Sequence, residues 1–255
     1  MELETKHAGE RAKWDQRAAE ELTADDLLPP DITFRAGVES DGDMSFVATE
    51  VENFLGDLNG KSVLELGCGR GTYAVLLARC GALVTATDLS PGSIEQTRRR
   101  AELNGVTLKT VVTAAEELPF PDESFDMAFG TSVLHHLEVD RAGPELTRVI
   151  KPNGKAFFRE PMGMNPLLRF ARNHLPYPYK TPRGADRPLS YTEIEAWGRG
   201  FSRYWFREYQ LFSMIERGFG FNHRFPRLRR FDHAALGRFP ALRRWARLVA
   251  IFGIR

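Results

Sequence analysis

Three glycines at alternate positions follow a short apolar stretch: Gly67, Gly69 and Gly71. Glycine carries no side chain, so a ligand can approach the backbone closely at such positions. Helix-compatible residues 73–78 follow, and a helix start offers unpaired N–H groups and the positive end of its dipole. Asp88 ends the following strand-like run, 82–87, and an acidic residue about 20 positions past the first glycine suits a ribose diol. The spacing indicates a site for a nucleoside-containing cofactor.

The glycine turn departs from the fingerprint of dinucleotide-binding proteins. That fingerprint reads G-x-G-x-x-G, and its third glycine lets the helix pack tightly. Here Thr72 holds that position and Gly71 comes one residue early. The sequence therefore misses the strict nicotinamide pattern.

Strand-like and helix-like segments alternate around these residues, which predicts an α/β fold with a doubly wound, mostly parallel, seven-stranded sheet. Ligands of such sheets bind at the carboxyl ends of the strands, and the residues above fall at such ends. The predicted strands are 62–66, 83–87, 107–112, 125–129, 155–159, 204–213 and 217–225, and the predicted helices are 8–28, 44–57, 71–80, 91–104 and 138–149.

Five ordered motifs resemble those of the class I S-adenosylmethionine-dependent methyltransferases, whose fold is Rossmann-like. They are Glu65-Leu66-Gly67-Cys68-Gly69-Arg70-Gly71, Asp88-Leu89-Ser90, the segment 116–126, Leu134-His135-His136-Leu137 and Lys151-Pro152-Asn153-Gly154-Lys155. The resemblance covers residues 60–160. It is closest to the small-molecule (type 11) branch, which includes ubiquinone/menaquinone C-methyltransferases and natural-product sugar O-methyltransferases. It implies S-adenosyl-L-methionine as cofactor and S-adenosyl-L-homocysteine as product.

The resemblance also implies a role for individual residues. Asp88 would hold the two ribose hydroxyls, and Glu65 would orient the methionine ammonium. Family members usually carry an Asp that accepts from the adenine amino group, but Ala114 stands there, so Glu116 is the candidate replacement. The implied cofactor-binding set is Glu65, Gly67, Cys68, Gly69, Gly71, Asp88, Leu89, Ala115, Glu116 and Thr131.

Two histidines and a carboxylate are the candidate catalytic residues. His135 and His136 follow the fourth predicted strand, and Glu160 follows the fifth. A sulfonium methyl is already activated, so the enzyme mainly aligns a nucleophile with it. A hydroxyl nucleophile also needs a base, and a histidine assisted by a carboxylate suits proton removal near neutral pH. We predict His136 or His135 as the base with Glu160 assisting; the alternative is that the imidazoles cap the following helix and pack the strand end.

Aromatic residues indicate where an acceptor would bind. Trp14 lies in the predicted N-terminal helix, and residues 161–198 form a proline-rich insertion of the kind that serves as a lid. The candidate substrate-binding residues are Trp14, Tyr177, Tyr179 and Tyr191. Packing of the lid itself is the alternative role for each of them.

Charge is divided unevenly along the 255 residues. The net charge is +1, with −13 in residues 1–150 and +14 in residues 151–255. Either the basic part meets an anionic partner, or the two parts neutralise each other. The only cysteines, Cys68 and Cys80, suggest no disulfide framework and no metal site. They also argue against arsenite methyltransferases, which need more thiols, and they fit a reducing cytoplasm.

The last residues predict a basic amphipathic helix over 239–252, with apolar positions on one face and arginines off it. Such a helix either packs on the sheet or makes a peripheral contact with an anionic membrane. No separate nucleic-acid-binding module is present. The N-terminus is too acidic for a signal peptide.

These features predict one methyltransferase domain over residues 1–255. Its parts would be an N-terminal helical lid (1–59), a cofactor-binding core (60–160), a lid insertion (161–198), and a sheet edge with the basic C-terminal helix (199–255). We predict a cytoplasmic enzyme that O-methylates a small hydroxylated or lipid-like acceptor. The alternatives are a quinone-type C-methyltransferase and a catalytically silent cofactor-binding adaptor at a membrane surface. The sequence fixes neither the acceptor nor the oligomeric state.

Overall fold

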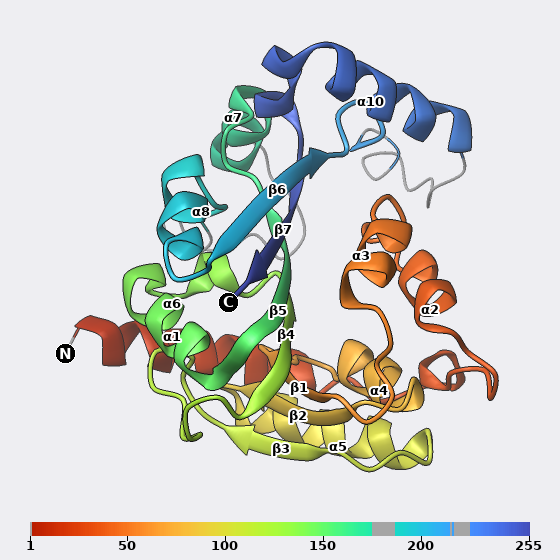
Figure 1. Ribbon diagram of the computed structural model, residues 1–255, viewed down its shortest axis with the longest axis vertical. Coiled ribbons are helices and arrows are strands. Elements are labelled where there is room, and N and C mark those ends of the chain that lie inside the picture. Colours follow the sequence, from red (N-terminus) through yellow and green to blue (C-terminus); the bar gives the residue numbers. More distant parts are fainter. Residues whose placement is uncertain (1, 175–186, 215, 217–224) are drawn as a thin grey trace.

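The structure is a computed structural model that describes residues 2–174, 187–214, 216 and 225–255. Its centre is a seven-stranded sheet in the order β3-β2-β1-β4-β5-β7-β6, shown in Figure 1. Strands β1 to β5 pair in parallel, whereas β7 runs antiparallel to both β5 and β6. The predicted mostly parallel, seven-stranded α/β fold is confirmed. The strands are β1 Ser62–Leu66, β2 Leu83–Asp88, β3 Lys109–Val112, β4 Phe125–Thr131, β5 Ile150–Pro161, β6 Arg203–Tyr209 and β7 Leu248–Ile254.

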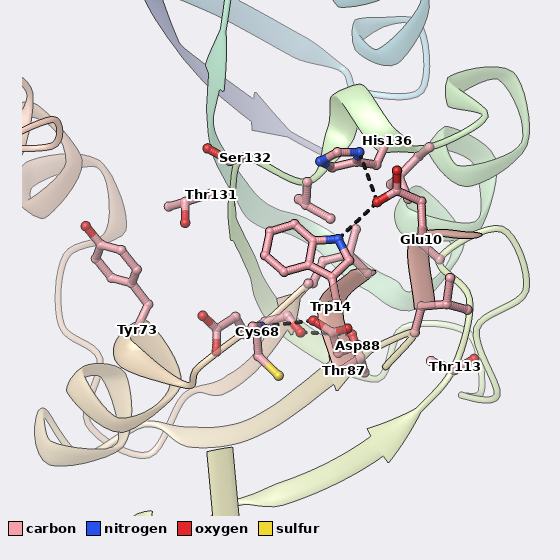
Figure 2. Close-up of a pocket in the computed structure, with 18 of the residues that line it drawn as sticks. Glu10, Trp14, Cys68, Tyr73, Thr87, Asp88, Thr113, Thr131, Ser132 and His136 are labelled. Atoms are coloured by element: carbon pink, nitrogen blue, oxygen red, sulfur yellow. Dashed lines mark hydrogen bonds and ion pairs between the residues drawn. The ribbon is translucent and has the colours of Figure 1, made fainter. Parts of the chain in front are cut away.

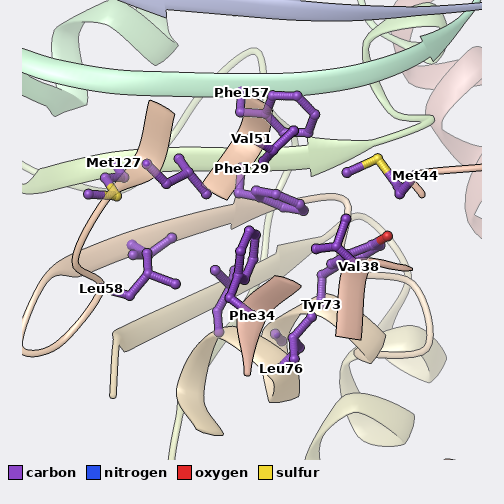
Figure 3. Packing of buried hydrophobic residues seen from close by; sticks show 14 of the residues in the cluster. Phe34, Val38, Met44, Val51, Leu58, Tyr73, Leu76, Met127, Phe129 and Phe157 are labelled. Atoms are coloured by element: carbon purple, nitrogen blue, oxygen red, sulfur yellow. The ribbon is translucent and has the colours of Figure 1, made fainter. Parts of the chain in front are cut away.

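Helices cover both faces of the sheet (Figure 1). On one face α2, α3 and α4 enclose a core that includes Phe129 and Phe157, seen in Figure 3. On the other face α6 and α8 pack against Phe158 and Ile251. Helix α1 lies against α5. The helices are α1 Glu2–Ala18, α2 Phe34–Ser40, α3 Ala48–Leu55, α4 Thr72–Arg79, α5 Pro91–Leu103, α6 Val139–Val149, α7 Pro166–His174, α8 Tyr191–Gly198 and α10 Pro226–Arg238, and the 3-10 helices are η1 Ala24–Asp26, η2 Leu134–His136 and η3 Pro240–Trp245.

The N-terminal helices differ from the predicted ones. A single helix over 8–28 is wrong, because α1 ends at Ala18 and a separate 3-10 turn, η1, follows. The carbonyl of Glu20 accepts a hydrogen bond from Gln96 Nε2 (2.7 Å), so this part of the chain is anchored to α5 instead of continuing as a helix. The predicted helix over 44–57 is shorter and is preceded by α2, which the prediction lacked. The Asp41 carboxylate accepts from the backbone N–H of Asp43 (3.0 Å) and closes the turn between the two helices.

The predicted C-terminal amphipathic helix is also wrong. Residues 240–245 form the short helix η3, and Leu248–Ile254 form β7, which lies between β5 and β6. Nearly all of β7 is buried, and a continuous apolar run is what a strand covered on both faces requires. The predicted membrane contact was assigned to this helix, so it has no structural basis in the observed fold. Of the predicted edge strands, β6 matches 204–213 in part, and 217–224 lie outside the described residues.

The two oppositely charged parts of the chain meet in the folded structure. Arg207 Nη1 contacts Glu50 Oε2 at 2.5 Å, Arg247 pairs with Asp43, and Lys151 Nζ lies 2.9 Å from Asp126 Oδ1. These contacts support the interpretation that the acidic and basic parts neutralise each other. Within the described residues, no helix combines the length and the apolar character that crossing a membrane would need.

Candidate functional site

A cavity of about 360 Å³ opens at the carboxyl ends of β1, β2, β4 and β5. Figure 2 shows it between the sheet edge and helix α1. The ends of parallel strands meet at one edge of a sheet, so motifs far apart in the sequence come together there. Most of the predicted cofactor-binding residues line this cavity: Glu65, Gly67, Cys68, Gly69, Asp88, Leu89, Ala115, Glu116 and Thr131.

The glycine turn has the geometry that only glycine adopts easily. Gly67, Gly69 and Gly71 have φ angles of 66°, 51° and 76°, in the left-handed region. A Cβ on Gly67 would lie 2.5 Å from Val133 Cγ2, and one on Gly71 would lie 2.9 Å from Thr97 Cα. A Cβ on Gly69 would meet nothing within 4 Å. Gly67 and Gly71 are thus glycines because of packing, and Gly71 itself does not line the cavity.

Asp88 stands at the end of β2 and is held by two backbone groups. Its Oδ2 accepts from the N–H of Gly69 and its Oδ1 accepts from the N–H of Ser90, both at 2.9 Å. Burial raises the pKa of Asp88 in spite of these hydrogen bonds. Each carboxylate oxygen keeps a lone pair that can accept from a ligand hydroxyl. The arrangement fits the two hydroxyl groups of a ribose.

Glu65 is the second carboxylate at this end of the cavity. Its side chain is buried, and Oε2 has no hydrogen-bond partner among the described residues. Burial, and then the nearby charge of Asp88, raise the pKa of Glu65 well above its usual range. The backbone N–H of Ala74 donates to the carboxyl group, but a buried oxygen without a partner is costly, so Oε2 is suited to meet a cationic or hydrogen-bonding ligand.

The segment after β3 lines the neighbouring wall. Ala114, Ala115 and Glu116 all contribute to it. Glu116 Oε1 accepts from the backbone N–H of Glu138 at 2.9 Å, and Oε2 lies 3.4 Å from His7 Nε2. His7 was not predicted from the sequence, because nothing in its local pattern shows that α1 crosses the cavity.

Helix α1 supplies a further wall. Trp14 Nε1 donates to Glu10 Oε2 at 3.0 Å, and His136 Nδ1 lies 3.5 Å from the same oxygen (Figure 2). Burial would raise the pKa of Glu10, but the contacts with His136, Lys13 and Trp14 together lower it. Asp15 fixes the helix, since its Oδ1 accepts from Ser90 Oγ at 2.5 Å and from the N–H of Gly92 at 3.0 Å. Of the predicted substrate-binding residues, Trp14 therefore does line the cavity.

The predicted catalytic residues divide into two groups. His136 lines the cavity, whereas His135 and Glu160 do not. Glu160 is fully buried, and its Oε1 accepts from the N–H groups of Val133 (2.8 Å) and Leu134 (2.9 Å). Its Oε2 contacts His135 Nδ1 at 2.7 Å. The predicted pairing of Glu160 with a histidine is thus present at His135, but neither residue lines the cavity, and Glu160 also holds the turn after β4. Which histidine acts as base stays a prediction.

The remaining aromatic predictions lie elsewhere. Tyr191 does not line the cavity; its hydroxyl donates to Glu208 Oε1 at 2.9 Å, and its ring packs on Phe206. Tyr177 and Tyr179 lie outside the described residues.

Four polar residues that the sequence did not indicate line the end of the cavity near Thr131: Asp41, Tyr73, Ser132 and Arg159. Tyr73 donates its hydroxyl to Asp41 Oδ2 at 2.6 Å. Burial and then Asp41 raise the pKa of Tyr73 well above its usual range, so the phenol stays protonated. Arg159 could have been considered from its place one residue before Glu160. Successive residues of a strand point to opposite faces of the sheet, so only one of these two neighbours can face the cavity.

The fold and the site together resemble those of the class I S-adenosylmethionine-dependent methyltransferases. The solved structure of geranyl diphosphate C-methyltransferase from Streptomyces coelicolor, which holds S-adenosyl-L-homocysteine, has a similar fold, with a TM-score of 0.64 over 98% of both chains at 14% identity. Residues 64–158 match the methyltransferase domain family. The predicted family and its cofactor agree with this match over residues 64–158.

Curated relatives match the same part of the chain. Ubiquinone biosynthesis O-methyltransferase from Methylocella silvestris is 42% identical over 86 residues, covering 34% of this chain and 33% of that protein. Fatty-acid O-methyltransferase from Mycolicibacterium smegmatis is 40% identical over 101 residues, covering 38% and 36%. Malonyl-[acyl-carrier protein] O-methyltransferase from Herminiimonas arsenicoxydans is 35% identical over 129 residues, covering 49% and 47%. The chain thus spans less than half the length of these relatives.

Proposed function

We propose that this protein transfers the methyl group of S-adenosyl-L-methionine to an oxygen atom of a small acceptor. The observation that carries the proposal is that one cavity is lined both by residues that fit the cofactor and by polar residues that could meet an acceptor. Asp88, Glu65 and the glycine turn form an end suited to a nucleoside and an amino acid, and His136, Tyr73 and Arg159 add polar groups beyond it.

The residues present fit the cofactor. Asp88 would accept hydrogen bonds from the ribose hydroxyls, and the unpartnered Oε2 of Glu65 would face the methionine ammonium. Ala115 and Glu116 would border the adenine. The cofactor supplies a methyl group that its sulfonium has already activated, so the protein's task is to align the acceptor oxygen with the C–S bond and exclude water.

His136 is the proposed base for a hydroxyl acceptor. Its imidazole lines the cavity beside Glu10, and its Nδ1 has no hydrogen-bond partner within the described part of the chain. The imidazole would accept the proton of the acceptor hydroxyl while the bound cofactor supplies the methyl group. Three relatives that methylate oxygen favour this over C-methylation: those named for ubiquinone biosynthesis, fatty acids and malonyl-[acyl-carrier protein].

C-methylation of a quinone remains the second candidate, since demethylmenaquinone methyltransferase from Clavibacter sepedonicus is 39% identical over 97 residues. The adaptor hypothesis loses its main support, because the predicted C-terminal helix is a buried strand of the sheet.

Transfer of label from [methyl-³H]S-adenosylmethionine tests the proposal. Hydroxylated, carboxylic and quinol acceptors are offered to the wild type, to Asp88→Ala and to a control, Asp57→Ala. Asp57 is a surface residue outside the cavity, and its carboxylate accepts from the nearby N–H of Asn59. We expect the wild type and the control to place the label on an acceptor oxygen, as a base-stable methyl ether or a base-labile methyl ester. Asp88→Ala should lose transfer. Transfer only to carbon would refute O-methylation.

A further inference from the structure

Arg159 is a buried cation with donor groups left over. It lies near the end of β5, its side chain is 13% exposed, and it lines the cavity. Nη1 donates to Ser132 Oγ at 2.9 Å, while Nη2 lies 3.8 Å from Asp41 Oδ2, beyond hydrogen-bond distance. Nε is buried and has no partner among the described residues. A guanidinium carries five N–H donors, so the two terminal nitrogens keep donors beyond the one that Nη1 gives to Ser132.

The nearby carboxylates are already occupied. Asp41 Oδ2 accepts from Tyr73 at 2.6 Å, and Oδ1 accepts from the N–H of Asp43 at 3.0 Å. Asp43 itself pairs with Arg247 and accepts from Gln210. These acids do not saturate the guanidinium, but they help to keep it ionised. Burial would lower the pKa of Arg159, and the groups around it, Asp41 and Asp43 among them, raise it instead.

The sheet provides a comparison within the same fold. Ala250 of β7 pairs with Arg159 on one side and with Arg207 of β6 on the other, so both arginines sit at one level of the sheet. Both terminal nitrogens of Arg207 are engaged, Nη1 with Glu50 Oε2 at 2.5 Å and Nη2 with His233 Nδ1. It does not line the cavity. Arg159 thus differs from Arg207 in having a terminal nitrogen, Nη2, that forms no hydrogen bond to the described residues and in lining the cavity.

We propose that Arg159, with Ser132 beside it, binds a carboxylate of the methyl acceptor. This inference rests on the proposed function and deepens it by naming a substrate class, the carboxylic acids. A planar carboxylate matches the fork of a guanidinium, which can give it two parallel hydrogen bonds. A monoanion fits better than a phosphate dianion, because Asp41 already offsets part of the single positive charge. The sulfonium of the bound cofactor would add a second cation near the acceptor.

Calorimetric titration of the S-adenosylhomocysteine complex with sodium octanoate and with octanamide tests the proposal. The amide has the same shape without the charge. We expect octanoate to bind at least about tenfold more tightly, the size of one charge-assisted hydrogen bond. Arg159→Gln should abolish the difference, Arg159→Lys should keep part of it, and the control Arg207→Gln should keep all of it. Inorganic phosphate should not bind more tightly than octanoate.

Three outcomes would overturn the inference: equal binding of octanoate and octanamide to the wild type, an unchanged preference in Arg159→Gln, or tighter binding of phosphate. Titration of each variant with S-adenosylhomocysteine shows that it is folded and separates the two proposals. Absence of S-adenosylhomocysteine binding by the wild type would refute the proposed function, whereas intact binding with no carboxylate preference refutes the inference alone.

Discussion

Replacement of Glu160 distinguishes a residue that holds the fold from one that acts on the substrate. The Glu160 carboxylate is fully buried and receives three contacts: the N–H groups of Val133 (2.8 Å) and Leu134 (2.9 Å), and His135 Nδ1 (2.7 Å). Glu160→Ala removes the acceptor for all three. A buried polar group left without a partner costs about 1–3 kcal/mol, so we expect the free energy of unfolding to fall by at least about 3 kcal/mol.

Glu160→Gln should cost much less, for a reason visible in the structure. Both backbone N–H groups are bonded to the same oxygen, Oε1, which the amide carbonyl of Gln can replace. Only the contact with His135 changes, and that imidazole can present its other tautomer to the new amide group. We expect a loss of about 1 kcal/mol. The fold of the turn after β4 should survive.

Urea unfolding followed by circular dichroism measures both variants, with methyl transfer measured alongside. His136→Ala is the matched comparison, since His136 lines the cavity and its Nδ1 has no hydrogen-bond partner in the described ranges. We expect it to lose transfer to hydroxyl acceptors while stability changes by less than about 1 kcal/mol. If Glu160→Ala stays as stable as the wild type and loses only transfer, Glu160 is catalytic and the reasoning fails.

Three further perturbations test the account. Gly71→Ala should destabilise the fold by about 2–4 kcal/mol, because its Cβ would lie 2.9 Å from Thr97 Cα. Gly69→Ala should cost only about 1 kcal/mol. Equal losses of the two variants in urea unfolding would contradict this. The pKa of Asp126 is lowered to about 2 from 3.8, since hydrogen bonds from Ser62 and Lys151 outweigh burial. The stabilisation by Asp126 is complete above its unfolded pKa and is lost as pH falls from about 4 to about 2. Asp126→Asn should remove about 1 kcal/mol of this acid-sensitive stability at unchanged S-adenosylhomocysteine affinity. An unaltered dependence of stability on acid pH would refute the assignment. Deleting 248–255 should prevent folding, and a truncated protein with a native circular dichroism spectrum would contradict the place of β7 in the sheet.

The sequence predicted the parts of the molecule in which local pattern and fold agree. The glycine turn and Asp88 lie at the ends of β1 and β2, where the alternation of strands and helices places them. Burial at the sheet centre makes such strands continuously apolar, so their existence is readable without partners. The same rule explains why the C-terminal helix was wrongly predicted. Residues 248–254 are an equally continuous apolar run, and the arginines before them gave the segment the pattern of an amphipathic helix.

The acceptor end of the cavity was beyond sequence reasoning. Arg159, Tyr73 and Asp41 come from β5, α4 and the turn after α2, and no local spacing relates them. Their meeting depends on the register of the sheet and on how α2 packs over α4. Likewise, His135 and His136 are adjacent in the sequence, yet of the two only His136 lines the cavity. His135 instead contacts the buried Glu160 carboxylate behind the turn after β4.

Calorimetric titration of S-adenosylhomocysteine into the wild type and Asp88→Ala, with Asp126→Ala as control, tests the central claim most directly. Asp88 accepts from Gly69 and Ser90 and faces the cavity, whereas Asp126 joins Ser62 and Lys151 away from it. The account predicts binding to the wild type and to Asp126→Ala, with affinity lowered about 100-fold or more in Asp88→Ala, as expected for the loss of two hydrogen bonds to a charged group. A folded wild type that does not bind, or an Asp88→Ala variant that binds equally well, would contradict it.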